Sequence, residues 1–123
     1  MITKEITLCG KQVTLAYCFA TEIAYKDLAN EDMYDYAKHA VDSIQNQRDP
    51  DAKRTIFAII ACMMAYYEKN LPVTDAEIMK TATPVEFIKA ILTVLNMRSE
   101  FYHIPKGEPE DKPKDGQDAE KNA

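Results

Sequence analysis

If residues 51–69 form a helix, that helix is apolar on almost every side, and this feature constrains the fold of the chain more than any other. A helix that is apolar nearly all round is buried, either within its own domain or against another chain. We therefore predict a central helix over 51–69, and its apolar excess also favours self-association. At helical spacing its widest stripe consists of Ile56, Ile59, Ile60, Met63, Met64 and Tyr67.

The first residues have the period of a β-strand rather than of a helix. Apolar and polar side chains alternate from Ile6 to Leu8 and again from Val13 to Tyr17, which is typical of half-buried strands. Gly10 lies between the two runs and can supply the positive φ that a tight turn requires. We predict a β-hairpin over 2–17, which needs helices to cover its apolar face.

Four further helices are predicted, over about 19–29, 32–45, 75–81 and 84–102. The last two begin with capping boxes, in which a Thr precedes a Glu by three residues: Thr74 with Glu77, and Thr83 with Glu86. The apolar positions expected to face the core are Phe19, Ile23 and either Ala24 or Leu28; Met33, Tyr36, Ala37, Ala40, Val41 and Ile44; and Phe87, Ile88, Ile91, Leu92 and Leu95, with Arg98 or Phe101.

The end of the sequence differs from the rest in composition. Residues 106–123 contain six acidic residues and four lysines, and Ala is their only aliphatic residue. Such a segment cannot bury enough apolar surface to offset the entropy of ordering, so we predict a disordered tail over 105–123. The fold class that follows is α+β and mostly helical, with one globular domain over 1–104.

Charge and cysteine content narrow the possible environments. The formal net charge of −5 argues against nucleic acid or an anionic membrane as a partner, because binding to either depends on Lys and Arg. The longest uncharged stretch within the domain, residues 55–67, is shorter than the ~20 residues that span a bilayer. No leader segment is visible, and the odd cysteine number favours free thiols and a cytoplasmic location over a disulfide framework. A Cys9–Cys18 pair, or a metal site that includes these two residues, is the less favoured alternative.

Motifs for catalysis or for cofactor and metal binding are not found in the sequence. It has no Gly-rich phosphate loop and no paired-His zinc motif, and His39 and His103 stand apart from any nucleophile. We therefore expect no enzyme activity, cofactor or metal from a single chain. An active site assembled between two chains is an alternative.

Tyrosine and methionine are the residues that point to binding, because both suit adaptable protein interfaces. We expect partner contacts from side chains at the ends of the central and last helices: Met63, Met64, Tyr66, Tyr67, Phe101 and Tyr102. The alternative is that these side chains complete the edge of the core. If they bind a partner, replacing Tyr66 or Tyr67 by Ala should weaken binding more than it destabilises the fold.

Three segments also carry a family resemblance: ITLCGKQVTL at 6–15, ATEIAYKDL at 20–28 and IFAIIACMMAYY at 56–67. Together with the order of the elements over roughly 2–102, they resemble the tail assembly chaperones of long-tailed bacteriophages. The resemblance implies a non-enzymatic protein of the host cytoplasm that binds the tape-measure and tail-tube proteins before the tail tube polymerises. It also implies ribosomal frameshifting late in the gene, for which Glu120-Lys121-Asn122 permits a slippery run of adenines. The alternative is a generic small helical adaptor or regulatory protein.

Overall fold

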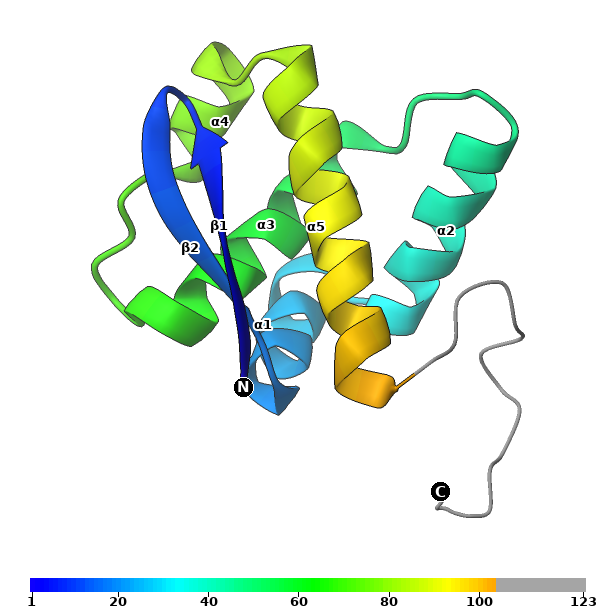
Figure 1. Cartoon of the computed structure of the whole chain (residues 1–123), viewed down its shortest axis with the longest axis horizontal. Coiled ribbons are helices and arrows are strands. Elements are labelled where there is room, and N and C mark those ends of the chain that lie inside the picture. The colour runs from blue at the N-terminus through cyan, green and yellow to red at the C-terminus, as the bar shows by residue number, and fades with distance from the viewer. Residues whose placement is uncertain (104–123) are drawn as a thin grey trace.

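The computed structural model describes residues 1–103 and confirms the predicted fold class, a hairpin packed with five helices (Figure 1). The helix predicted over about 32–45 begins one residue later, because Asp32 precedes it as the N-cap. The helix predicted over 51–69 is shorter at both ends: Asp51 precedes it as the N-cap, and Glu68, with φ 62°, follows it as the C-cap. The tail predicted over 105–123 lies outside the described residues. In chain order the elements are β1 (Ile2–Leu8), β2 (Lys11–Tyr17), α1 (Phe19–Ala29), α2 (Met33–Gln45), α3 (Ala52–Tyr67), α4 (Asp75–Thr81) and α5 (Pro84–Tyr102).

The hairpin turns over two residues, which fixes the register of its strands. Cys9 and Gly10 both have positive φ, 55° and 75°, as a type I′ turn requires. Leu8 therefore pairs with Lys11, and the antiparallel ladder continues to Ile2 opposite Tyr17.

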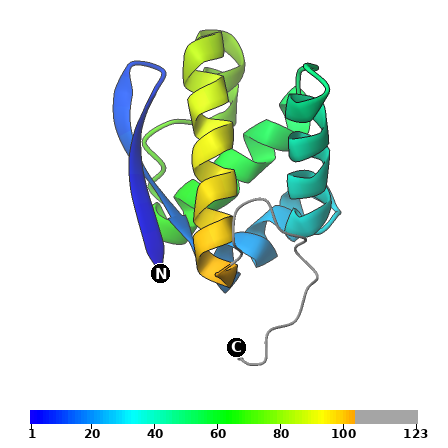
Figure 2. The ribbon, with the colours of Figure 1, turned by 45° about the vertical axis from the view of Figure 1, so that its right-hand side comes forward.

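Helix α3 lies at the centre of the molecule, as its sequence predicts. It contacts β2, α1, α2, α4 and α5. In both ribbon views α3 crosses behind α5, and α2 stands to the right of α5 (Figures 1 and 2). The hairpin lies on the other side of α5 from α2.

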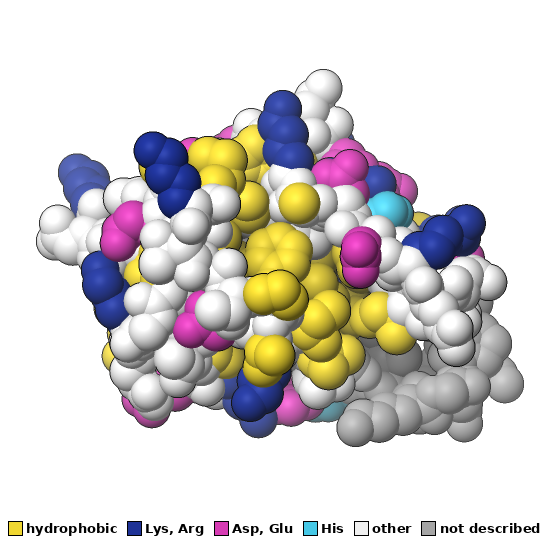
Figure 3. Space-filling view, turned by 90° about the horizontal axis from the view of Figure 1, so that it is seen from above, with side chains coloured by type: hydrophobic (Ala, Val, Ile, Leu, Met, Phe, Trp, Pro, Cys, Tyr) yellow, Lys and Arg dark blue, Asp and Glu magenta, His cyan; other side chains and the backbone are white. Residues whose placement is uncertain are grey.

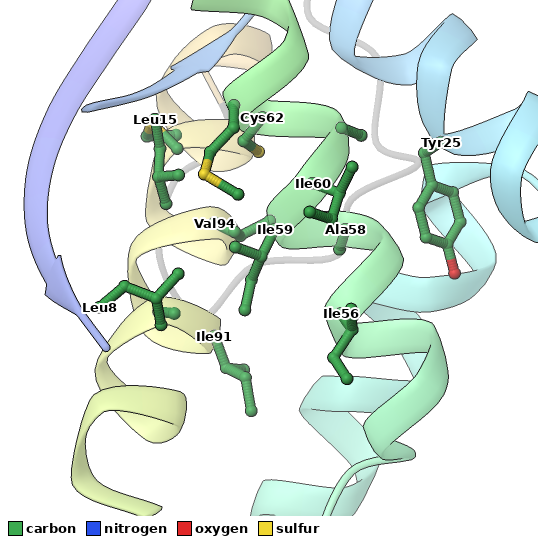
Figure 4. Packing of buried hydrophobic residues seen from close by; sticks show 14 of the residues in the cluster. Leu8, Leu15, Tyr25, Ile56, Ala58, Ile59, Ile60, Cys62, Ile91 and Val94 are labelled. Carbon is green, nitrogen blue, oxygen red and sulfur yellow. The ribbon is translucent and has the colours of Figure 1, made fainter. Parts of the chain in front are cut away.

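The core is built around the buried side chains of α3. Ile59 and Cys62 are fully buried and lie between the hairpin residues Leu8 and Leu15 and the α1 residue Tyr25 (Figure 4). Ile91 and Val94 of α5 pack against the same cluster. Within residues 1–103, no helix combines the length and the apolar character that crossing a membrane would require.

The buried face of α1 differs from the expected one. Phe19 and Ile23 are 65% and 63% exposed, whereas Thr21 and Tyr25 are buried. Hydrogen bonds fix this orientation: the Thr21 hydroxyl donates to the Ala16 carbonyl at 2.8 Å, and the Tyr25 hydroxyl donates to Glu31. A buried polar atom that makes such a hydrogen bond costs little folding free energy, so apolar content alone does not determine which face of a helix is buried.

Two other helices also expose side chains that were expected in the core. Val41 and Ile44 of α2 are exposed, as are Ile88 and Leu92 of α5. The buried positions of α5 include Ala90, Val94 and Met97 instead, so its apolar residues extend beyond the contact with the core.

Candidate functional site

The side chains expected to bind a partner lie at several depths. Met63 is fully buried and packs in the core, so it offers no surface to a partner. Beside it on α3, Met64 and Tyr66 are exposed. Tyr67 and Phe101 are half-buried against the core, and Tyr102 is exposed.

Tyr67 has a structural contact that the sequence does not reveal. Its hydroxyl oxygen accepts a hydrogen bond from the Thr14 N–H at 2.9 Å. Thr14 stands opposite Glu5 in a non-hydrogen-bonded pair, as the alternation from the Leu8–Lys11 pair requires, so its N–H points away from β1. Tyr67 thus covers the free edge of β2, and replacing it will destabilise the fold as well as alter the surface.

The end of α5 is joined to α1 and β2 by aromatic and polar contacts. The Phe101 ring lies 5.4 Å from the Tyr17 ring and 5.0 Å from the Phe19 ring, between centroids. The Tyr102 hydroxyl donates to the Glu22 carboxylate at 2.6 Å. The ring contacts of Tyr66 and Tyr67, by contrast, are with each other.

The same carboxylate also serves a buried tyrosine. The Tyr17 hydroxyl donates to Glu22 at 2.8 Å, and burial, followed by this bond, raises the pKa of Tyr17 above its usual value. The Arg98 guanidinium stacks over the Tyr102 ring at 4.9 Å. These contacts hold the end of α5 against α1 and β2. Side chains that complete the edge of the core, the alternative to partner binding, would make contacts of this kind.

A different surface, which the sequence did not single out, is open and apolar. It is a hollow of about 430 Å³ between the start of α3, α4, the start of α5 and the loop that follows α2. We call it the apolar groove, and Figure 3 shows hydrophobic side chains gathered in the middle of the face on which α4 and the start of α5 lie. Its lining residues are Asp49, Pro50, Ala52, Ile56, Ile78, Met79, Ala82, Thr83, Pro84, Phe87 and Ile88.

The apolar groove has a buried base and an exposed rim. Ile56 and Ile78 are buried at its base, whereas Met79 on α4 is 66% exposed and Ile88 on α5 is 43% exposed. A methionine at this position adds flexibility, because its unbranched side chain adapts to different neighbours. The rim is therefore apolar and able to adapt to a ligand.

Helix α2 also carries exposed apolar side chains. The Arg98 guanidinium lies 5.7 Å from the Tyr34 ring, which places Tyr34 on the side of α2 toward α5. Val41 follows Tyr34 by seven residues, which is close to two turns, so it lies near the same flank, whereas Ile44, ten residues on, is turned about 80° away. Val41 and Ile44 are exposed, and neither is in the lining of the apolar groove.

The apolar groove has little charge in its own lining. Asp49 is the one charged side chain that lines it among the described residues. Both acidic and basic side chains adjoin the lining in sequence, among them Asp51 and Lys80. Lys89, next to Ile88 in sequence, lines a separate hollow between β1 and α5.

The residues considered for chemistry have ordinary structural roles. The His39 Nε2 accepts a hydrogen bond from the Asp51 N–H at 2.8 Å, at the start of α3. Cys9, Cys18 and Cys62 are free thiols. Over residues 1–103, no group of three or more His, Cys, Asp or Glu side chains is placed to hold a metal ion.

Comparison of the chain with protein-family models, with curated proteins and with solved structures found no match.

Proposed function

We propose that the protein is a non-enzymatic tail assembly chaperone of a long-tailed bacteriophage, which binds the tape-measure and tail-tube proteins in the host cytoplasm. The sequence resemblance provides the family, and the apolar groove is the structural observation that supports a binding role. A contiguous exposed apolar surface is a common mark of a protein interaction site.

The physical task of such a chaperone suits this surface. A tape-measure protein is long, and its unassembled helices expose apolar stripes that aggregate unless they are covered. Exposed side chains such as Met79 and Ile88 can cover such stripes without a fixed partner geometry, and weak contacts repeated along one long chain add up through multivalency.

Co-expression tests the proposal directly. The tape-measure protein from the same genome is produced with and without this chain, and its soluble fraction and co-purification are measured. We expect the chain to raise the soluble fraction and to co-purify with the tape-measure protein, but not with an unrelated aggregation-prone helical protein of similar length. Failure on both measures would overturn the proposal and favour the generic adaptor.

Expression from the native nucleotide sequence, with downstream bases retained, tests the expected frameshift. Intact mass should detect a minor longer product that shares the sequence up to about residue 121. A single product would remove the frameshift from the proposal, and the solubility of the tape-measure protein would then decide it alone.

A further inference from the structure

We propose that the open edge of β1 binds an extended segment of a partner protein, which adds to the hairpin as a third strand. The segment lies between β1 and α5 and directs two apolar side chains and one acidic side chain toward α5. This surface is separate from the apolar groove, and the inference does not depend on the proposed function.

Unpaired backbone groups on β1 are the first observation. Hydrogen-bonded pairs alternate along the ladder from the Leu8–Lys11 pair, so the N–H and C=O groups of Thr3, Glu5 and Thr7 point away from β2. All three residues are exposed, and within residues 1–103 these backbone groups have no protein partner. This side of β1 is therefore an open strand edge.

The other edge of the hairpin is closed. The Thr14 N–H of β2 donates to the Tyr67 hydroxyl, and the Ala16 carbonyl accepts from the Thr21 hydroxyl. An exposed edge with unpaired main-chain groups is a template for strand addition. In this mode of recognition the main-chain hydrogen bonds provide affinity and alternate side chains provide specificity, so the ligand of β1 is an extended segment.

Space for the added strand lies between β1 and α5, which are in contact beside each other (Figures 1 and 2). Two adjoining hollows of about 580 and 450 Å³ are lined by both elements and share Glu5 and Thr93. We call the two hollows together the edge trough, whose lining on α5 runs from Val85 to Glu100. This stretch of helix is about 22 Å long, which is the length of about six or seven extended residues.

The α5 wall of the edge trough determines which side chains fit. Val85, Lys89 and Leu92 follow one another at i, i+4 and i+7, and all three line the same hollow. Val85 is 64% exposed and Leu92 is 45% exposed, so both offer apolar surface to a ligand. Alternate side chains of a strand point to one face, so an apolar, acidic, apolar order at alternate positions matches this wall.

Charge at the centre of this wall favours the acidic side chain. Glu5 accepts a hydrogen bond from the Gln12 side chain at 3.0 Å, and Glu86 accepts from the N–H groups of the hairpin turn. The Lys89 ammonium lines the same hollow and has no hydrogen-bond or ion-pair partner among residues 1–103. An acidic side chain opposite Lys89 therefore complements a charge that the hollow leaves unpaired.

Two other occupants fit the edge trough less well. Residues 105–123 of this chain include three prolines and two glycines but no β-branched or aromatic side chain, and this composition is unfavourable for a strand. The β1 strand of a second copy would bring its own β2 and α5 with it, whereas the edge trough is bounded by β1 and α5 and suits a strand without such neighbours.

Peptide binding to the full chain, measured by NMR, tests the proposal. The probe is the acetylated and amidated peptide Thr-Val-Thr-Glu-Thr-Val-Thr, whose order is the same in either strand direction, and a matched peptide has Lys in place of Glu. The bound probe should slow hydrogen exchange of the Glu5 and Thr7 N–H groups by about ten-fold or more. Exchange of the Thr14 N–H, which is already bonded to Tyr67, should not change.

Two N-methylated versions of the probe test strand pairing directly. One is methylated at the amide nitrogens of the two valines, and the other at those of the two inner threonines. Alternate amides of a strand point to the same neighbour, so one of these peptides should lose binding and the other should retain it.

Matched variants locate the binding site. Leu92→Glu should weaken binding of the probe by about ten-fold or more, as expected for a central contact. Val41→Glu on α2 is the control, because Val41 is 41% exposed, close to Leu92, and lies outside the edge trough. Lys89→Glu should reverse the preference, so that the lysine peptide binds more tightly than the probe. Circular dichroism confirms that each variant is folded.

Slower exchange at Glu5 and Thr7, with loss of binding for one methylated peptide only, supports the proposal. No saturable binding, a lysine peptide that binds wild type as tightly as the probe, equal effects of the two methylations, or equal effects of Leu92→Glu and Val41→Glu would overturn it. Slow exchange at Glu5 and Thr7 without peptide would also overturn it, because the edge would already be paired. The pairing would be with a second copy if the exchange depends on protein concentration, and with residues 105–123 if it does not.

Discussion

At the scale of single residues, Glu86 connects the hairpin turn to the start of α5. Its carboxylate accepts hydrogen bonds from the N–H groups of Cys9, Gly10 and Thr83, at 3.0, 3.1 and 3.1 Å. Cys9 has a left-handed backbone, which costs a non-glycine residue about 1 kcal/mol or more. The bonds from Glu86 stabilise the turn in that conformation.

These bonds make stability depend on pH. Hydrogen bonds from backbone N–H groups, first that of Thr83, hold the pKa of Glu86 below its usual value. The stabilisation is therefore complete above the unfolded-state pKa and is lost as the pH falls through the folded-state pKa. We expect Glu86→Gln to lower the Tm at pH 7 and to leave it nearly unchanged in acid, measured by circular dichroism from pH 7 to pH 3. Glu68→Gln, an exposed carboxylate at the end of α3, is the control; a constant difference at every pH would contradict the prediction.

Tyr67 allows a second test at this scale. Tyr67→Phe keeps the ring but removes the acceptor for the Thr14 N–H, so the free energy of unfolding should fall by about 1 kcal/mol in urea denaturation. Tyr66→Phe on the exposed neighbour should change it by less than about 0.5 kcal/mol. Equal effects would show that the Tyr67 hydroxyl does not cover the edge of β2.

At the scale of elements, α1 shows how polar residues determine which face of a helix is buried. The buried Thr21 hydroxyl donates to the Ala16 carbonyl and accepts from the Cys18 N–H at 3.2 Å. Thr21→Val keeps the shape but leaves both backbone groups without this partner, so we expect a loss of about 1–3 kcal/mol. Ile23→Ala on the exposed face should cost less than about 0.5 kcal/mol, although it removes more apolar surface. The free energies of unfolding of both variants are measured by urea denaturation. A larger loss for Ile23→Ala would indicate that the face of α1 expected from the sequence is the buried one.

The difference between local chemistry and packing explains which features of the helices could be predicted from the sequence. Periodicity and capping residues located every helix, because boundaries such as those at Thr74 and Thr83 depend on local chemistry. The exposed side chains of Phe19, Ile88 and Leu92 could not be predicted, because burial depends on which neighbours cover a face. Tyrosine enrichment likewise does not distinguish Tyr67, whose hydroxyl accepts from the Thr14 N–H, from the exposed ring of Tyr66. The apolar groove forms only when α4 and α5 pack across the start of α3, so its residues are dispersed in the sequence.

At the scale of the whole molecule, every helix and the hairpin pack on α3, so loss of α3 packing should unfold the domain as one unit. Cys62 on α3 is fully buried, and burial raises the pKa of its thiol, so two effects protect it from alkylation. Cys9 and Cys18 are only half-buried. We therefore expect iodoacetamide to label Cys9 and Cys18 in the folded protein, and Cys62 only through unfolding.

The labelling rate of Cys62 then measures the cooperativity of the fold. With a stability of about 5 kcal/mol, the unfolded fraction is on the order of one in several thousand, and labelling should slow by that factor relative to an unfolded thiol. The measurement is intact mass over time on a Cys9→Ala, Cys18→Ala variant, with the same variant in urea as the unfolded reference. Subdenaturing urea should accelerate labelling with the full unfolding m-value, because the opening that exposes Cys62 is global. Labelling that is fast and independent of urea would mean instead that α3 opens locally, and that the other helices hold the domain together without it.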